Sequence, residues 1–335
     1  MNALAPYTIK NITLKNRVVM PPMCMYQAQN GHVNAFHRAH YATRAMGQVG
    51  FIIVEATAVT PEGRITDNDL GIWSDEHIAG LKQLVDEVHH YGAKIGIQLQ
   101  HAGRKSTSSS VPHLAPSALA FSDRYDTPNA MTQADIDRVI AAFKAAAQRA
   151  DQAGFDAIEL HGAHGYLINE FMSPLANQRT DGYGGSLANR GRFLRELVDA
   201  IRPVWPADKL FQIRVSAEEY HPDGNHPMDV IDLLRPVADA FDLIHVSSGG
   251  VANVSMSPFP LYQVDFAKAI KAALHKPVIA VGLITTREQV EAVLQDVDLV
   301  ALGRELLRHP YWVNAAYAAD HQLDAVFESY RRGYQ

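Results

Sequence analysis

The amino-acid sequence predicts an α/β protein that folds as a single (β/α)8 barrel, the TIM-barrel architecture. Short apolar runs rich in β-branched residues alternate with amphipathic stretches of helical period along the 335 residues. Eight such runs can be counted, and a closed barrel explains eight parallel strands better than an open sheet does. Because no linker divides the chain, we expect residues 1–335 to form one domain.

The strands and helices can be placed in order along the chain. We expect the eight strands at residues 17–23, 49–59, 93–101, 155–163, 210–217, 241–249, 277–282 and 297–304. Helical periodicity predicts helices within residues 34–48, 74–92, 132–154, 186–202, 228–240 and 286–296. Ser74 is suited to begin a helix, and Gly92 and Gly154 are suited to end one. In such a barrel the active site lies at the C-terminal ends of the strands.

Residues 103–131, after the third predicted strand, form a long segment rich in Ser, Pro and Ala with little helical period. This composition predicts an extended loop. Because the third strand ends at the expected site, one interpretation is a subdomain that covers the site. The alternative is a plain insertion at the surface.

Composition narrows the classes of function. A net charge of −6 gives no electrostatic reason to expect nucleic acid or an acidic membrane surface as a partner. The single cysteine, Cys24, excludes an intrachain disulfide and a cysteine-rich metal site, and it favours a reducing compartment. The first residues lack the long apolar core of a signal peptide, and no stretch is long enough to span a membrane. We therefore expect a cytoplasmic protein.

Two histidines and a tyrosine follow the fourth predicted strand in the sequence HGAHGYL, residues 161–167. Buried polar side chains need hydrogen-bonding or charged partners, so polar residues at the end of a buried strand indicate a structural or functional role. His161, His164 and Tyr166 could belong to a metal site, to a packed structural corner, or to a set of hydrogen-bond donors for a ligand.

The last two predicted strands each end in a glycine, at Gly282 and Gly303, and Arg304 follows the second one. Phosphate often binds at this place in (β/α)8 barrels, because glycine lets backbone N–H groups approach it and arginine adds a charged fork. The alternative is that both glycines only relieve crowding in turns. The chain has no GxGxxG sequence after a strand, so a mononucleotide is a better match than a dinucleotide.

Six segments resemble the old yellow enzyme family of flavin-dependent ene-reductases, in particular its bacterial branch of thermophilic-like NADPH dehydrogenases. They are PPMCMY (21–26), EATAV (55–59), IQLQHAGR (97–104), HGAHGYLINEFMSPLANQRTDGYGGSLANRGRF (161–193), IRVSA (213–217) and ALGRELLRHPYW (301–312). The fourth segment is the most specific. The resemblance spans nearly the whole chain and implies a (β/α)8 barrel that binds FMN noncovalently.

The resemblance also implies which residues hold the cofactor. Arg214 would lie near flavin N1 and O2, where positive charge stabilises the reduced flavin. Cys24 would tune the flavin rather than act as a nucleophile, although by base rate a lone cysteine is more often a small buried hydrophobe. The full set implied to bind FMN is Pro21, Pro22, Met23, Cys24, Ala56, Gln98, Arg214, Gly282, Gly303 and Arg304.

For the reaction, the resemblance implies that NADPH reduces the flavin at N5 and leaves. An activated alkene, such as an α,β-unsaturated carbonyl compound or a nitroalkene, then receives the hydride at its β-carbon. His161 and His164, with Tyr26, would hold the substrate oxygen by donated hydrogen bonds. Tyr166 would give a proton to the α-carbon, since a phenol with an ordinary pKa of about 10 can protonate a stronger carbon base.

The chain ends in YRRGYQ. In the branch that it resembles, a C-terminal arginine reaches the neighbouring subunit's site, and Arg332 matches that position. The resemblance therefore implies a homodimer or homotetramer in which the tail, about residues 320–335, contributes Arg332 across the interface. A frayed basic tail is the alternative.

Two other functions compete with the ene-reductase. A metal-dependent hydrolase would use His161, His164 and Glu170 as ligands, but short motifs of this kind often match by accident, and we expect no metal. A barrel that binds FMN only to carry or sense it would need no proton donor, so Tyr166 argues against it.

Overall fold

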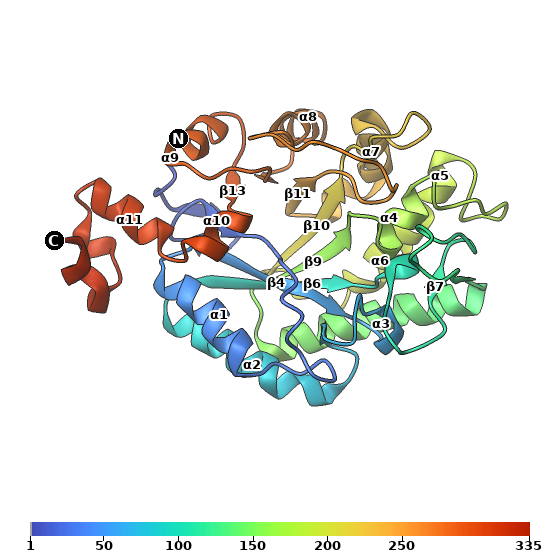
Figure 1. The fold of residues 1–335 in the computed structure, drawn as a ribbon, viewed down its shortest axis with the longest axis horizontal. Helices are drawn as coiled ribbons and strands as arrows, with labels where there is room; N and C mark the ends of the chain where they lie inside the picture. The colour runs from blue at the N-terminus through green and yellow to red at the C-terminus, as the bar shows by residue number, and fades with distance from the viewer. Residues whose placement is uncertain (1) are drawn as a thin grey trace.

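The computed structural model describes residues 2–335 and contains the predicted closed barrel of parallel strands (Figure 1). Each strand pairs with its two neighbours, and β3 closes the barrel because it pairs with both β13 and β4. The strands are β3 (Val18–Met20), β4 (Phe51–Ala58), β6 (Lys94–Gln100), β9 (Ala157–Gly162), β10 (Leu210–Ser216), β11 (Leu243–Ser247), β12 (Val278–Ala280) and β13 (Leu299–Ala301). All eight expected strands are confirmed.

Helices surround the barrel. They are α1 (Ala35–Met46), α2 (Ile78–His90), α3 (Gln133–Ala153), α4 (Leu167–Met172), α5 (Leu187–Arg190), α6 (Arg192–Ile201), α7 (Pro227–Leu234), α8 (Val264–Leu274), α9 (Arg287–Val293), α10 (Gly303–Arg308) and α11 (Trp312–Ala319). Gly154 ends α3 in the left-handed conformation, as predicted. Ser74 caps a short 3-10 turn that leads into α2.

Two expected helices are interrupted, and four helices, α4, α8, α10 and α11, lie outside the expected ranges. The stretch 186–202 divides at Gly191 into α5 and α6. The stretch 228–240 leaves the α-helical form after Leu234, because Pro236 has no N–H to donate to the preceding turn. Helix α8 follows a long irregular loop, so no clear change in the sequence pattern marks where the helix begins.

A hairpin closes the N-terminal end of the barrel. Strands β1 (Tyr7–Ile9) and β2 (Ile12–Leu14) pair antiparallel. Their apolar side chains share one buried cluster with the first residues of several barrel strands, including Phe51, Ala157 and Leu210. Removal of this apolar surface from water stabilises the hairpin against the barrel. The cavity described below lies at the opposite end.

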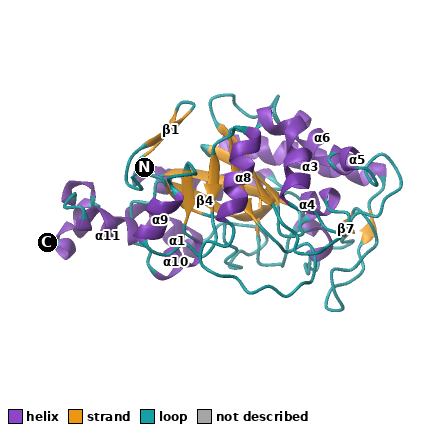
Figure 2. Cartoon of the chain, turned by 90° about the horizontal axis from the view of Figure 1, so that it is seen from above, coloured by secondary structure: helices purple, strands orange, loops and turns teal. Residues whose placement is uncertain are grey.

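The segment 103–131 forms an extended loop subdomain, as expected. It contains two-residue strands, β7 (Leu114–Ala115) and β8 (Asn129–Ala130), which pair with each other. Arg179 holds this pair in place, because its Nη1 donates to the carbonyl oxygens of Pro116 at 2.9 Å and Met131 at 2.6 Å. Figure 2 shows β7 among loops that gather along one side of the barrel.

The C-terminal segment projects from the side of the barrel beyond α11 (Figure 1). Tyr330 packs edge-on against Tyr311 with ring centroids 5.1 Å apart, whereas Arg332 is exposed. Among residues 2–335, no helix combines the length and the apolar character that crossing a bilayer requires.

Candidate active site

The turn after β9 brings together the three side chains of HGAHGYL. His164 and Gly165 both adopt positive φ angles, 59° and 73°, which reverse the chain before α4 begins. The ring centroid of His161 then lies 5.2 Å from that of His164 and 4.8 Å from that of Tyr166. The predicted cluster of two imidazoles and a phenol is therefore present.

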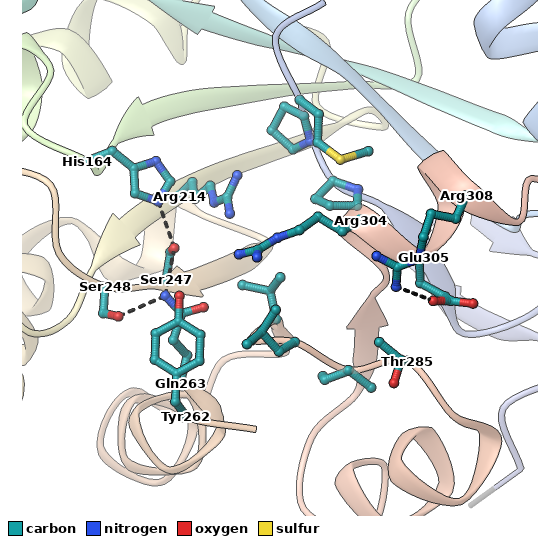
Figure 3. Close-up of a pocket in the computed structure, with 18 residues that line it drawn as sticks. His164, Arg214, Ser247, Ser248, Tyr262, Gln263, Thr285, Arg304, Glu305 and Arg308 are labelled. Carbon is teal, nitrogen blue, oxygen red and sulfur yellow. Dashed lines mark hydrogen bonds and ion pairs between the residues drawn. The ribbon is translucent and has the colours of Figure 1, made fainter. Parts of the chain in front are cut away.

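Hydrogen bonds assign different roles to the ring nitrogens of the two histidines. The backbone N–H of Ala163 donates to His161 Nδ1 at 3.3 Å, so the proton of a neutral His161 lies on Nε2. His164 Nε2 is 2.7 Å from Ser247 Oγ (Figure 3). Since Gln263 Nε2 donates to the same oxygen at 3.2 Å, the hydroxyl hydrogen of Ser247 is free for His164. The proton of a neutral His164 then lies on Nδ1.

Burial controls the protonation of this cluster. Burial, reinforced by the positive charge of Arg214, lowers the pKa of His161 and of His164 well below 6.5. Burial also raises the pKa of Tyr166 well above 10. At neutral pH the three side chains are therefore neutral groups, and each carries a hydrogen that it can donate.

A cavity of about 360 Å³ opens at the C-terminal ends of β3 and β10–β13 (Figure 3). Many of the predicted site residues line it: Pro21, Pro22, Met23, His164, Arg214, Gly282, Gly303 and Arg304. Gly282 has a φ angle of 134°, a conformation that L side chains rarely adopt, so this turn requires glycine.

The positive charges of the cavity lack partners in the protein. The Arg214 side chain is buried, and neither it nor Arg304 makes a hydrogen bond or ion pair with any of residues 2–335; Arg214 Nε is both buried and unpaired. Burying a polar group without a partner is costly. Arg308, by contrast, pairs with Glu305 at 2.7 Å. Two free guanidinium groups fit a flavin phosphate and the electron-rich edge of a flavin ring.

A second group of predicted residues forms an apolar wall beside Tyr166. Cys24 and Tyr166 pack against a buried cluster of Ala56, Ile65 and Ala102. Burial raises the pKa of the Cys24 thiol, which therefore stays protonated. Tyr26 is 43% exposed, so its side chain is open to solvent and to a ligand. Glu55 anchors this loop, because its Oε2 accepts from the backbone N–H of Met25 at 2.8 Å.

Gln98 lies deeper in the barrel, among partners that no motif of the sequence indicates. Its Nε2 donates to Glu159 Oε1 at 2.7 Å. Glu159 in turn joins Gln212 and His245, all within the barrel interior. The alternation of inward and outward residues in the predicted strands could have identified this group, because Glu159 stands two residues before His161 and Gln212 two before Arg214.

Lys105 was also missed. Its Nζ donates to the carbonyl oxygens of His164 at 2.9 Å and Gly250 at 3.1 Å, and it lies 5.2 Å from the centre of the Tyr166 ring. Burial lowers its pKa to about 8. Nothing in the sequence locates this contact, because it joins three loops that are far apart in the chain.

The residues of the metal hypothesis are arranged differently from a metal site. Glu170 Oε1 accepts from the backbone N–H of Arg104 at 2.9 Å, and its carboxylate lies against Gly103. In the described part of the chain, no three His, Cys, Asp or Glu side chains gather as a metal-binding group. Arg332 lies away from the cavity of its own chain, whose lining residues end at Arg308.

Comparison with known proteins is consistent with this site. Residues 3–321 match the family described as NADH:flavin oxidoreductase / NADH oxidase. The chain is 55% identical over 317 residues to an NADPH dehydrogenase of Clostridium acetobutylicum, covering 93% of this chain and 94% of the relative. It is 51% identical over 339 residues to an NADPH dehydrogenase of a Geobacillus species, covering 99% and 98%.

A solved structure of another reductase has the same fold. Morphinone reductase superposes with a TM-score of 0.80 at 27% identity, covering 91% of this chain and 86% of that one. The resemblance to old yellow enzymes is thereby confirmed. With its barrel and its cationic cavity, the chain belongs to the NADH:flavin oxidoreductase / NADH oxidase family and is a flavin-dependent NAD(P)H oxidoreductase.

Proposed function

We propose that this protein is an ene-reductase that uses NADPH to reduce the C=C bond of activated alkenes. The observation that carries the proposal is the cluster of neutral His161, His164 and protonated Tyr166 beside a cavity with an unpaired, buried Arg214. The histidines are suited to hold a substrate oxygen, and the phenol is suited to deliver a proton. A barrel that only carries FMN has no need of such a group.

The cofactor would be held at the ends of the strands. Pro21, Pro22, Met23 and Cys24 would line one side, with Ala56 and Gln98 toward the pyrimidine edge. Arg214 would face that edge, and Gly282, Gly303 and Arg304 would hold the phosphate. Bound FMN would supply the transfer of two electrons from NADPH to the β-carbon of the alkene.

The substrate would be positioned by the protein's own donors. Nε2–H of His161 and Nδ1–H of His164, with Tyr26, would donate to the carbonyl or nitro oxygen, where negative charge develops. Tyr166 would then donate its phenolic proton to the α-carbon. Because burial keeps the phenol protonated, the proton is available throughout the neutral pH range.

Replacing Tyr166 by Phe tests the proposal. NADPH should still bleach the yellow holoenzyme under nitrogen, whereas recovery of the colour on adding cyclohexenone should slow by roughly a hundredfold or more. Stopped-flow absorbance separates the two steps. Wild-type protein that bleaches but does not recover with cyclohexenone would contradict the ene-reductase and support the FMN carrier.

We propose further that the protein is cytoplasmic and assembles as a homodimer or homotetramer in which Arg332 reaches a neighbouring subunit. The exposure of Arg332 and the projection of the tail from the barrel support this arrangement (Figure 1). Arg332→Ala should raise the KM for the alkene and leave flavin content unchanged. Light scattering would report the assembly, and a monomer at working concentration would exclude the shared arginine.

A further inference from the structure

Three neighbouring strands place a row of polar side chains across the interior of the barrel. Gln98 on β6 is in register with Glu159 on β9, and Glu159 is in register with Gln212 on β10. All three side chains are buried, with at most 1% exposure. We call Gln98, Glu159 and Gln212 the interior row.

Glu159 determines how the two amides are turned. Gln98 Nε2 donates to Glu159 Oε1 and Gln212 Nε2 donates to Glu159 Oε2, both at 2.7 Å. An ionised carboxylate can only accept hydrogen bonds, so each glutamine must present its amide nitrogen to Glu159. The carbonyl oxygens, Oε1 of Gln98 and of Gln212, are consequently turned away from it.

Those carbonyl oxygens have no partner in the protein. Gln212 Oε1 is buried and unpaired, and Gln98 Oε1 makes no hydrogen bond with any of residues 2–335. A network that only filled the barrel would be expected to satisfy its polar atoms. The unpaired acceptors therefore point to a ligand whose N–H groups complete the row.

The carboxylate of Glu159 also interacts with His245 and Arg214, which lie next to the interior row. Its Oε2 is 3.0 Å from His245 Nδ1, and His245 is in register with Arg214. The negative charge of Glu159 favours the charged form of Arg214, whose pKa burial lowers. Burying a carboxylate costs free energy, which favours a role for the charge of Glu159 beside Arg214.

We propose that Glu159 is a positioning residue for the flavin. It turns the amide of Gln98 so that its carbonyl oxygen accepts from the cofactor, and it places a fixed negative charge beneath Arg214. This inference rests on the proposed FMN site and on no step of alkene reduction. It adds a residue that touches only other side chains of the protein.

Glu159→Gln tests the role with little change in shape. The amide that this substitution introduces can accept from one neighbouring amide only, so Gln98 loses its fixed orientation. Dilution of the holoenzyme, followed by fluorescence of the released FMN, should show a Kd raised about fivefold to tenfold, the effect of losing one hydrogen bond between the neutral Gln98 amide and the cofactor. The midpoint potential of the flavin should rise by about 30 mV, a tenfold change for a two-electron couple, because a nearby negative charge is gone.

A double variant that combines Glu159→Gln with Gln212→Glu separates orientation from a general loss of packing. Gln98 Nε2 can then donate to the new amide at position 159, and that amide can donate to the new carboxylate at position 212. Gln98 thus keeps its orientation, and the row keeps its charge. We expect both Kd and potential to return most of the way to wild type. If the single variant does not fold, recovery of FMN binding in the double variant still supports the proposal.

Glu219→Gln is the matched control. Glu219 is a buried carboxylate that also accepts from neutral groups, at 2.8 Å from Ser173 Oγ and 2.9 Å from the backbone N–H of Asn225, but it lies outside the interior row. It should lower the thermal midpoint without changing the Kd for FMN. Unchanged Kd and potential in folded Glu159→Gln, or a double variant no better than the single one, would overturn the inference. If the wild-type protein reduced no alkene but the variants changed the Kd for FMN and the flavin potential as expected, the proposed function would be wrong and this inference would stand.

Discussion

The protonation states of His161 and His164 are set by burial and by Arg214 rather than by the pH of the solvent. Both imidazoles have a pKa well below 6.5, and that of the Tyr166 phenol is raised well above 10. None of the three changes its charge between about pH 6.5 and pH 10. We therefore expect the rate of flavin reoxidation by an alkene to show no titration of these three groups between roughly pH 6.5 and 9; a change near pH 8 would report Lys105, whose pKa is about 8 and whose Nζ lies 5.2 Å from the centre of the Tyr166 ring.

Stopped-flow measurement of the reoxidation step across this range checks the expectation. NADPH reduction, measured separately on the same samples, serves as the control for effects on the cofactor or on binding. A sigmoidal rise or fall of the reoxidation rate near pH 7 would show that a histidine of the pair titrates there, contrary to its buried environment.

At the residue scale the sequence identified side chains that belong to a recognisable motif and missed those that act only through distant contacts. Tyr166 and Arg304 stand in motif segments and lie at the predicted strand ends. Lys105 stands beside one of these segments, but its role depends on carbonyl oxygens of residues 164 and 250. Such contacts follow from the closure of the barrel and leave no local pattern in the chain.

At the scale of elements, the loop after β9 touches the loop after β11 backbone to backbone. A Cβ atom added to Gly165 would lie 2.3 Å from the carbonyl oxygen of Gly250, and one added to Gly250 would lie 2.6 Å from His164 Cα. Both glycines have positive φ, 73° and 93°. The two loops can approach only because neither carries a side chain there, and the position of Tyr166 depends on this approach.

Gly165→Ala should therefore displace the turn that carries His164 and Tyr166. Gly185→Ala is the control, because Gly185 has a similar φ of 76° and no atom within 4 Å of an added Cβ. Both variants carry a strain of about 1–2 kcal/mol from the left-handed conformation. Urea denaturation should show a clearly larger loss for Gly165→Ala, together with slow alkene reduction. Equal losses would mean that the loops can separate without cost.

The element predictions succeeded where the hydrophobic pattern was long and regular. The buried strands and α3, with its capping Thr132 and its terminal Gly154, are examples. They were less complete where a single residue interrupts a helical pattern, as Gly191 and Pro236 do, because periodicity averages over such positions. Helix α8 was missed because a long irregular loop precedes it.

At the scale of the whole molecule, buried titratable groups make stability depend on pH in two opposing ways. Burial lowers the pKa of His37 and of His101 to about 4, so the stability they contribute is present above pH 6.5 and is lost as the pH falls toward 4. Burial raises the pKa of Glu55 to about 7 and of Glu170 to about 8. Their contribution is present below pH 4.5 and is lost as the pH rises through 7 and 8.

Between pH 4.5 and 6.5 the histidines make stability rise with pH, whereas the buried glutamates make it fall. The thermal midpoint of the holoenzyme should therefore be highest within about that interval and should decline toward pH 8. Calorimetry across buffers of equal ionic strength measures it. Glu170→Gln should flatten the decline on the alkaline side. A midpoint that kept rising up to pH 8 would contradict the assignment of these buried carboxyl groups.

The hairpin of β1 and β2 covers the N-terminal end of the barrel. Its apolar side chains pack against the first residues of the strands, and the cavity at the C-terminal ends of the strands is where a solute can enter. Under the proposed function, the nicotinamide donor and the alkene acceptor would both enter by this one cavity. The oxidised nicotinamide would then have to leave before the alkene binds, and we expect steady-state kinetics of the ping-pong type.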